Sequence, residues 1–214
     1  MPDHVALDES PLIMPGRSKY MHLRIARYIS NILSPMTISL PLVTLAALYH
    51  EHNSPLKVAG HVFLTLLFVS IGPLLYILIG VRKGKFTDLD VSVRTQRNGP
   101  FLFMLISTLL GLFLLSLIHA PRNLQTLLII AIFGGLVLMI TTHWWKISIH
   151  AASMGVAVTF LTALYGIIVL PAYLLVVLVG WSRVVLRHHT VAQVIAGSLV
   201  SIALSAIVLV VRGI

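Results

Sequence analysis

The chain has 214 residues, 58% of them hydrophobic and only 10% charged, and its mean hydropathy is +1.00. Soluble domains are about 45–50% apolar and about 25% charged, so this composition excludes an ordinary soluble domain and predicts a multi-pass integral membrane protein. The sequence contains no cysteine, which excludes disulfides, thiolate metal sites and cysteine nucleophiles.

Charge is distributed unevenly along the chain. Fifteen Lys and Arg residues face six Asp and Glu residues, for a net charge of +9, and residues 91–214 carry no carboxylate side chain. That region holds five histidines together with Arg183 and Arg187. Histidine and arginine without acid predict an anionic partner, phosphate above all. The alternative is that the basic residues only set the membrane topology.

The N-terminal part is expected to lie outside the bilayer. Residues 1–16 are polar and predict a tail, and residues 17–31 mix apolar and basic side chains, which predicts a short helix on the membrane surface. Residues 1–31 are therefore assigned to a tail and surface helix, and residues 32–214 to one transmembrane domain.

Apolar runs of near-spanning length fill the rest of the chain. A membrane-crossing helix needs roughly 20 apolar residues, and five runs approach this length: 32–49, 57–80, 100–118, 124–142 and 190–211. The stretch 150–181 is too long for one crossing. Gly166 and Pro171 near its middle predict a turn between two short helices, 148–165 and 168–181. The expected fold is an all-α bundle of seven transmembrane helices, or six if 32–49 does not span.

Three polar segments interrupt the apolar chain, at 82–99, 143–150 and 181–193. If 150–181 is a hairpin, all three lie on one side of the membrane. Twelve of the 15 Lys and Arg residues then fall on that side, and the positive-inside rule predicts that it is cytoplasmic.

The third segment carries the most informative pattern. Ser182 and Arg183 precede His189, and Gln193 follows it by four residues, on one face if the segment is helical. The pattern resembles the third motif of the type 2 phosphatidic acid phosphatase superfamily, Ser-Arg-x5-His-x3-Asp, with Gln193 in place of the final Asp. His189-Thr190-Val191-Ala192-Gln193 also resembles the dolichyl diphosphate phosphatase branch, in which the motif ends in His-Thr-x2-Gln.

The other two segments carry weaker forms of that superfamily's motifs. Ile147-Ser148-Ile149-His150 is similar to Pro-Ser-Gly-His and keeps Ser and His. The superfamily's first motif is Lys-x6-Arg-Pro. If Arg97 is its arginine, Asp90 stands at the lysine position and Asn98 at the proline position. The resemblance covers roughly residues 57–211.

The resemblance implies a metal-independent lipid phosphatase or diphosphatase that needs no cofactor and acts through a phosphohistidine. It makes His189 the nucleophile, Gln193 the residue that orients its ring, and His150 the acid that protonates the leaving oxygen. His188 is expected to be structural. The implied phosphate ligands are Arg183, Ser148, Arg97, Arg94, Lys146 and Ser182. The expected partners are a lipid phosphate, prenyl or glycerolipid, and the surrounding membrane lipids, and no nucleic acid.

Two alternative functions exist for a polytopic protein of this kind, and the sequence disfavours the first. An intramembrane prenyltransferase needs two Asp-rich motifs for magnesium-bound diphosphate, and only Asp88 and Asp90 are available. A non-catalytic or transport-type member of the same fold would bind phospholipid without turnover. Gln193 and the degraded first motif favour this second alternative.

Overall fold

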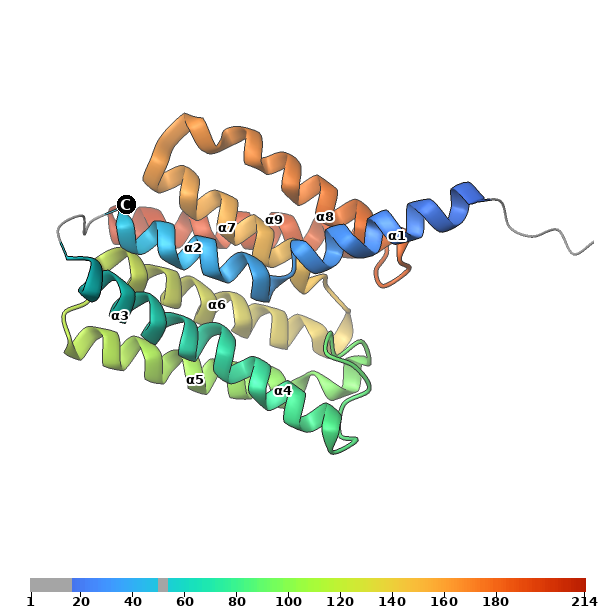
Figure 1. The fold of residues 1–214 in the computed structure, drawn as a ribbon, viewed down its shortest axis with the longest axis horizontal. Helices are drawn as coiled ribbons and strands as arrows, with labels where there is room; N and C mark the ends of the chain where they lie inside the picture. Colours follow the sequence, from blue (N-terminus) through green and yellow to red (C-terminus); the bar gives the residue numbers. More distant parts are fainter. Residues whose placement is uncertain (1–16, 50–53) are drawn as a thin grey trace, which may run out of the picture.

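The computed structural model describes residues 17–49 and 54–214, and in this part of the chain the regular structure is entirely helical. The expected tail at residues 1–16 lies outside the described residues. Figure 1 shows the helices alongside one another, with α1 projecting beyond the bundle. The α-helices are α1 (Arg17–Ile32), α2 (Pro35–Leu48), α3 (Pro55–Leu66), α4 (Gly72–Arg82), α5 (Asn98–Leu117), α6 (Arg122–Trp144), α7 (Ile149–Tyr165), α8 (Tyr173–Val185) and α9 (Val191–Arg212).

The predicted all-α membrane bundle is confirmed. Five helical stretches of the described chain are long and apolar enough to cross a membrane, one of them the stretch Ile149–Val185 that contains both α7 and α8. A sixth exists if α1 and α2 count as one span bent by 42°. The first of the five joins α3 to α4 through a π-helical turn, η1 (Leu67–Ile71). With 14 residues, α2 alone is about 21 Å long, shorter than the roughly 30 Å hydrocarbon core.

The bend between α1 and α2 has a local cause. Ser34 caps α2 by accepting a hydrogen bond from the backbone N–H of Thr37, and Pro35 supplies the first helical residue. One side of α1 buries Ala26 and Ser30, while Tyr20 and Tyr28 remain largely exposed. The predicted helix at 17–31 is therefore present, and its buried side packs on α8.

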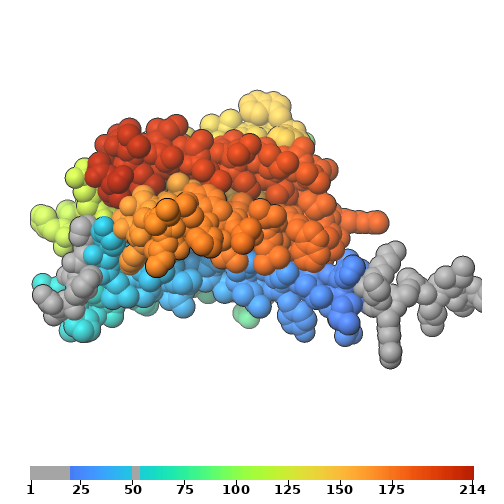
Figure 2. All heavy atoms as spheres, turned by 90° about the horizontal axis from the view of Figure 1, so that it is seen from above, coloured from blue at the N-terminus to red at the C-terminus, as the bar shows by residue number. Residues whose placement is uncertain are grey.

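The predicted turn within 150–181 is confirmed, although the second helix begins later than expected. Gly166 has a φ of 74°, which favours glycine, and ends α7. A 3₁₀ segment, η3 (Gly166–Ala172), follows and contains Pro171, which has no N–H to donate. The second helix therefore begins at Tyr173 instead of 168. Figure 1 shows α8 running back alongside α7, and Figure 2 shows α8 and η3 between α9 and the α1–α2 pair.

Close packing of α7 on α9 brings two of the polar segments together. A Cβ built on Gly197 would lie 2.8 Å from the carbonyl oxygen of Ser148, so only glycine allows the two backbones to approach this closely. The backbone N–H of Ser148 donates to the carbonyl oxygen of Gln193 at 3.3 Å. The start of α7 is thereby held against the start of α9.

Candidate functional site

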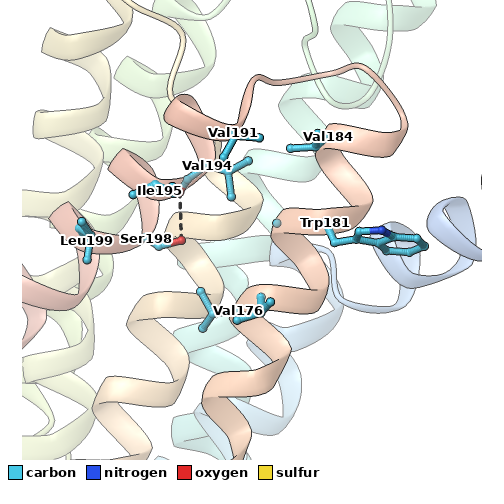
Figure 3. Close-up of a pocket in the computed structure, with 10 residues that line it drawn as sticks. Val176, Trp181, Val184, Val191, Val194, Ile195, Ser198 and Leu199 are labelled. Carbon is cyan, nitrogen blue, oxygen red and sulfur yellow. Dashed lines mark hydrogen bonds between the residues drawn. The ribbon is translucent and has the colours of Figure 1, made fainter.

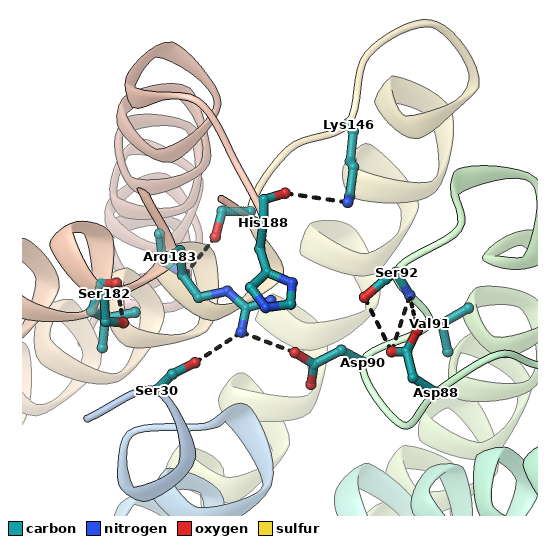
Figure 4. A network of polar contacts seen from close by, with 12 residues as sticks. Ser30, Asp88, Asp90, Val91, Ser92, Lys146, Ser182, Arg183 and His188 are labelled. Atoms are coloured by element: carbon teal, nitrogen blue, oxygen red, sulfur yellow. Dashed lines mark hydrogen bonds and ion pairs between the residues drawn. The ribbon is translucent and has the colours of Figure 1, made fainter. Parts of the chain in front are cut away.

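The three polar segments meet at one end of the bundle, as the hairpin predicts. Lys146 Nζ donates to the carbonyl oxygen of His188 at 3.2 Å, which joins the second segment to the third. Arg183 Nη1 lies 2.9 Å from Asp90 Oδ2, which joins the third segment to the first (Figure 4). The same end of the bundle therefore contains every residue of the predicted site.

His189 lies in the turn between α8 and α9, outside both helices. The turn is made by Arg187, whose φ of 56° reverses the chain at the end of α8. The backbone N–H groups of His188 and His189 then donate to the carbonyl oxygen of Arg183 at 3.1 and 3.3 Å. These bonds satisfy an otherwise unpaired carbonyl at the C-terminus of α8 and anchor the turn.

The predicted contact between His189 and Gln193 is confirmed, but its origin is a helix cap and not a shared helical face. Thr190 is the N-cap of α9, and its hydroxyl accepts from the backbone N–H of Gln193, while the Gln193 side chain accepts from the backbone N–H of Thr190. Gln193 Oε1 also lies 3.2 Å from His189 Nδ1. One side-chain oxygen therefore both caps the helix and holds the imidazole.

This double contact determines the tautomer of His189. A backbone N–H only donates, so the Gln193 atom that faces Thr190 is the carbonyl oxygen, which accepts. The same oxygen meets His189 Nδ1, so Nδ1 carries the proton and donates. In the neutral ring the lone pair is then on Nε2.

His189 is neutral at physiological pH. Its side chain is 7% exposed, and burial lowers its pKa to about 3, with nearby positive charges acting in the same direction. These charges belong to Lys146, Arg183 and Arg97. The neutral imidazole has a free nitrogen lone pair, and the three cations beside it favour an anionic ligand.

Arg183 is a buried cation of the cluster and connects three segments of the chain. It is 3% exposed, and its Nη1 bonds to both Asp90 Oδ2 and Ser30 Oγ, at 2.9 and 2.8 Å. Its Nε is buried without a hydrogen-bond acceptor among the described residues. A buried N–H without an acceptor is costly, and an oxygen of a bound anion would satisfy it.

A strained turn presents Asp90 to Arg183. The side chain of Asp88 accepts from the backbone N–H and the hydroxyl of Ser92, and Val91 between them has a φ of 46°. A positive φ is costly for a β-branched residue. The turn also directs the carbonyl oxygen of Val91 at Arg97 Nε, 2.9 Å away. The turn therefore contacts two of the three arginines predicted to bind phosphate, Arg183 and Arg97.

Asp90 remains ionised in this setting. Burial by itself raises the pKa of its carboxyl, but the interaction with His150 and the positive charge of Arg183 outweigh burial and bring the pKa below its ordinary value. His150 is 7% exposed and is the second residue of α7. Its interaction with Asp90 places it in the same cluster as Arg183.

The remaining predicted ligands make mostly backbone contacts. Ser148 is fully buried and caps α7 through the N–H of Ala151, and the Ser182 hydroxyl donates to the Val179 carbonyl within α8. Arg94 Nη1 donates to two carbonyls at the end of α6, those of His143 and Trp144. None of the hydrogen bonds described for Arg94 reaches the histidine–arginine cluster.

Three residues of the cluster have roles that the motifs did not assign. Asp90 stands at the lysine position of the first motif, and the motif does not indicate that it pairs with Arg183. His188, expected to be structural, interacts with both Arg183 and Asp90, and burial and the Arg183 charge lower its pKa. Ser30 belongs to α1 and no motif signals it. No group of three or more His, Asp or Glu side chains in the described chain is arranged to hold a metal ion.

Comparisons with family models, curated proteins and solved structures find no match for this chain. What points to a function is therefore the motif resemblance together with the geometry of this end of the bundle.

Proposed function

We propose that this protein is a membrane-embedded lipid phosphatase or diphosphatase that needs no metal and works through a phosphohistidine at His189. The observation that carries the proposal is the orientation of His189. Its Nδ1–H is held by Gln193, and its neutral ring lies among three cations. A neutral, oriented imidazole in a cationic site is suited to attack phosphorus.

In the first step, the Nε2 lone pair of His189 forms a bond to phosphorus and the bond from phosphorus to the leaving oxygen breaks. The negative charges of Asp90 and of the bound phosphate favour the protonated form of His150, which gives its proton to the leaving oxygen. In the second step, water attacks the phosphohistidine, the phosphorus–Nε2 bond breaks, and His150 takes a proton from the water. The sum is hydrolysis of one phosphate ester or anhydride bond.

The cations stabilise the charge that develops on the phosphoryl oxygens. Arg183 is the main candidate, because its buried Nε has no acceptor among the residues that the structure describes and arginine matches phosphate geometry. Arg97 and Lys146 add positive charge at His189. The Gln193 side chain orients the ring without the negative charge that aspartate brings, which favours substrates with a good leaving group such as a diphosphate.

The test is phosphate release by the purified protein. The substrates are phosphatidic acid, phosphatidylglycerol phosphate, farnesyl phosphate and farnesyl diphosphate, each with and without EDTA. We expect release that EDTA does not affect and that His189→Ala lowers about a thousandfold or more. His143→Ala is the matched control, since His143 is an exposed histidine at the start of the second polar segment. Release that depends on magnesium, or survives in His189→Ala, would contradict the proposal.

The intermediate provides a second test. A reaction stopped without acid should yield a phosphoramidate on His189 by mass spectrometry. The adduct should accumulate in His150→Ala with a diphosphate substrate, because the leaving phosphate needs little protonation whereas hydrolysis of the adduct needs a base. An adduct on His188 would reverse the assignment.

One observation favours a second function, lipid-phosphate binding without turnover. Arg183 already pairs with the carboxylate of Asp90, which competes with a substrate phosphate for the same guanidinium. A purified protein that binds farnesyl phosphate in vesicles but releases no phosphate from any of the four substrates would support this function over the enzyme.

A further inference from the structure

A groove of about 460 Å³ lies between α8 and α9 (Figure 3). From α8 it is lined by Val176, Trp181 and Val184, and from α9 by Val191, Val194 and Leu199. The hydroxyl of Ser198, also in the lining, donates to the carbonyl of Val194 at 3.0 Å and so has its partner. The groove therefore offers no unpaired side-chain hydroxyl to an occupant and suits an apolar one.

The groove begins where the candidate site ends. Val184 directly follows Arg183, and Val191 is the second residue after His189, so the turn between α8 and α9 closes the polar end of the groove. The apolar lining of the groove thus ends within two residues of Arg183 and His189 along the chain. This combination matches a molecule with an anionic head group and a hydrocarbon tail.

The depth of the groove is limited by contact between the two helices. A Cβ built on Gly180 would lie 2.6 Å from Val194 Cγ1, so α8 and α9 touch there and form a floor. The rim is open, because Val177 and Leu199 are 69% and 62% exposed. An occupant can therefore enter sideways from the hydrocarbon core of the bilayer.

We infer that the α8–α9 groove holds the hydrocarbon chain of the lipid whose phosphate is bound beside His189. This inference rests on the proposed function and adds the position of the chain and its route of entry. It follows that chain length affects binding through α8 and α9, and that the chemistry at His189 does not depend on the groove.

The test narrows the groove and compares a long with a short substrate of the same chemistry. Val177→Trp and Leu199→Trp place an indole at the rim of the groove. Leu174→Trp and Ile207→Trp are matched controls, because these residues are exposed on the same helices and are not part of the lining. The substrates are farnesyl phosphate and dimethylallyl phosphate, which share an allylic ester and differ in chain length.

We expect the groove variants to raise KM for farnesyl phosphate about tenfold, with KM for dimethylallyl phosphate unchanged and with both control variants like the original protein. Equal KM values for farnesyl phosphate in groove and control variants would overturn the inference and leave the phosphatase proposal standing. A protein that hydrolyses neither substrate would instead overturn the phosphatase proposal.

Photocrosslinking tests the groove without turnover. A farnesyl phosphate analogue with a diazirine in its chain should label α8 and α9 when irradiated in vesicles, and excess farnesyl phosphate should suppress the labelling. Labelling that maps to another pair of helices would overturn the inference even for an active enzyme.

Discussion

The Asp90 carboxylate lies 2.9 Å from the Arg183 guanidinium, although Asp90 stands where the phosphatidic acid phosphatase pattern has a lysine. Asp90 supplies an anion that occupies an arginine predicted to bind phosphate.

Asp90→Asn should therefore tighten substrate binding. The amide oxygen can still accept from Arg183, but the competing negative charge is gone. We expect KM for farnesyl phosphate to fall roughly fivefold, on the order of 1 kcal/mol for a partly exposed ion pair. Asp88→Asn is the control, since it removes the same charge from a residue whose side chain bonds to Ser92. A KM that rises in Asp90→Asn would show that the carboxylate assists binding.

The acid limit of activity should lie below the ordinary pKa of histidine and should respond to Lys146. Burial and then the Lys146 charge hold the pKa of His189 at about 3, so the nucleophile stays unprotonated as pH falls through 6.5. Removing a neighbouring positive charge raises a histidine pKa. Lys146→Gln should therefore move the acid limb of kcat/KM to higher pH, and the exposed Lys85→Gln should not. An unmoved limb in Lys146→Gln would show that another group controls it.

Gln193→Ala should affect both turnover and stability. It removes the acceptor for His189 Nδ1, and by analogy with hydrogen-bonded histidines at metal sites we expect turnover to fall about tenfold or more. It also removes one half of the capping box of α9, which should lower the free energy of unfolding by about 1 kcal/mol. Gln193→Glu keeps an acceptor oxygen at the same reach and should retain most of the turnover. Unchanged turnover in Gln193→Ala would mean that another group orients the ring.

Gly197→Ala should separate α7 from α9 and damage the site. The added Cβ would lie 2.8 Å from the carbonyl oxygen of Ser148, and a backbone atom can move away only at a high energetic cost. We expect a loss of about 1–3 kcal/mol of stability, measured by thermal unfolding in detergent. Gly60→Ala in α3 is the matched control, because no neighbouring atom of the described residues lies within 4 Å of its Cβ position, and it should be neutral or stabilising. Equal melting temperatures for the two variants would contradict this account.

The predicted cytoplasmic location of the site can be tested in a chain without cysteine. Lys85 and Lys57 are both exposed, Lys85 in the first polar segment and Lys57 in α3 at the opposite end of the bundle (Figure 1). A membrane-impermeant thiol reagent applied to intact cells should label Lys57→Cys and spare Lys85→Cys. The reverse pattern would place the site on the outer face.

Much of the fold follows from local features of the sequence. The apolar runs predicted the long helices to within a few residues, because a backbone in a bilayer must satisfy its hydrogen bonds within the helix. Gly166 and Pro171 predicted the hairpin that brings the three polar segments to one end. The contact between His189 and Gln193 was also predicted from their spacing of four residues, although a helix cap and not a shared helical face produces it.

Only the tertiary structure decided which distant side chains meet. Arg183 bonds to Ser30, 153 residues away, and to Asp90 in another segment, and no local spacing encodes either contact. Arg97 is bound by the Val91 carbonyl because Val91 adopts a backbone conformation unusual for its residue type. The sequence by itself determined which residue types gather at this end of the bundle. Helix packing decided which of them are paired and which are left for a ligand, because a contact between helices depends on their rotation and close approach.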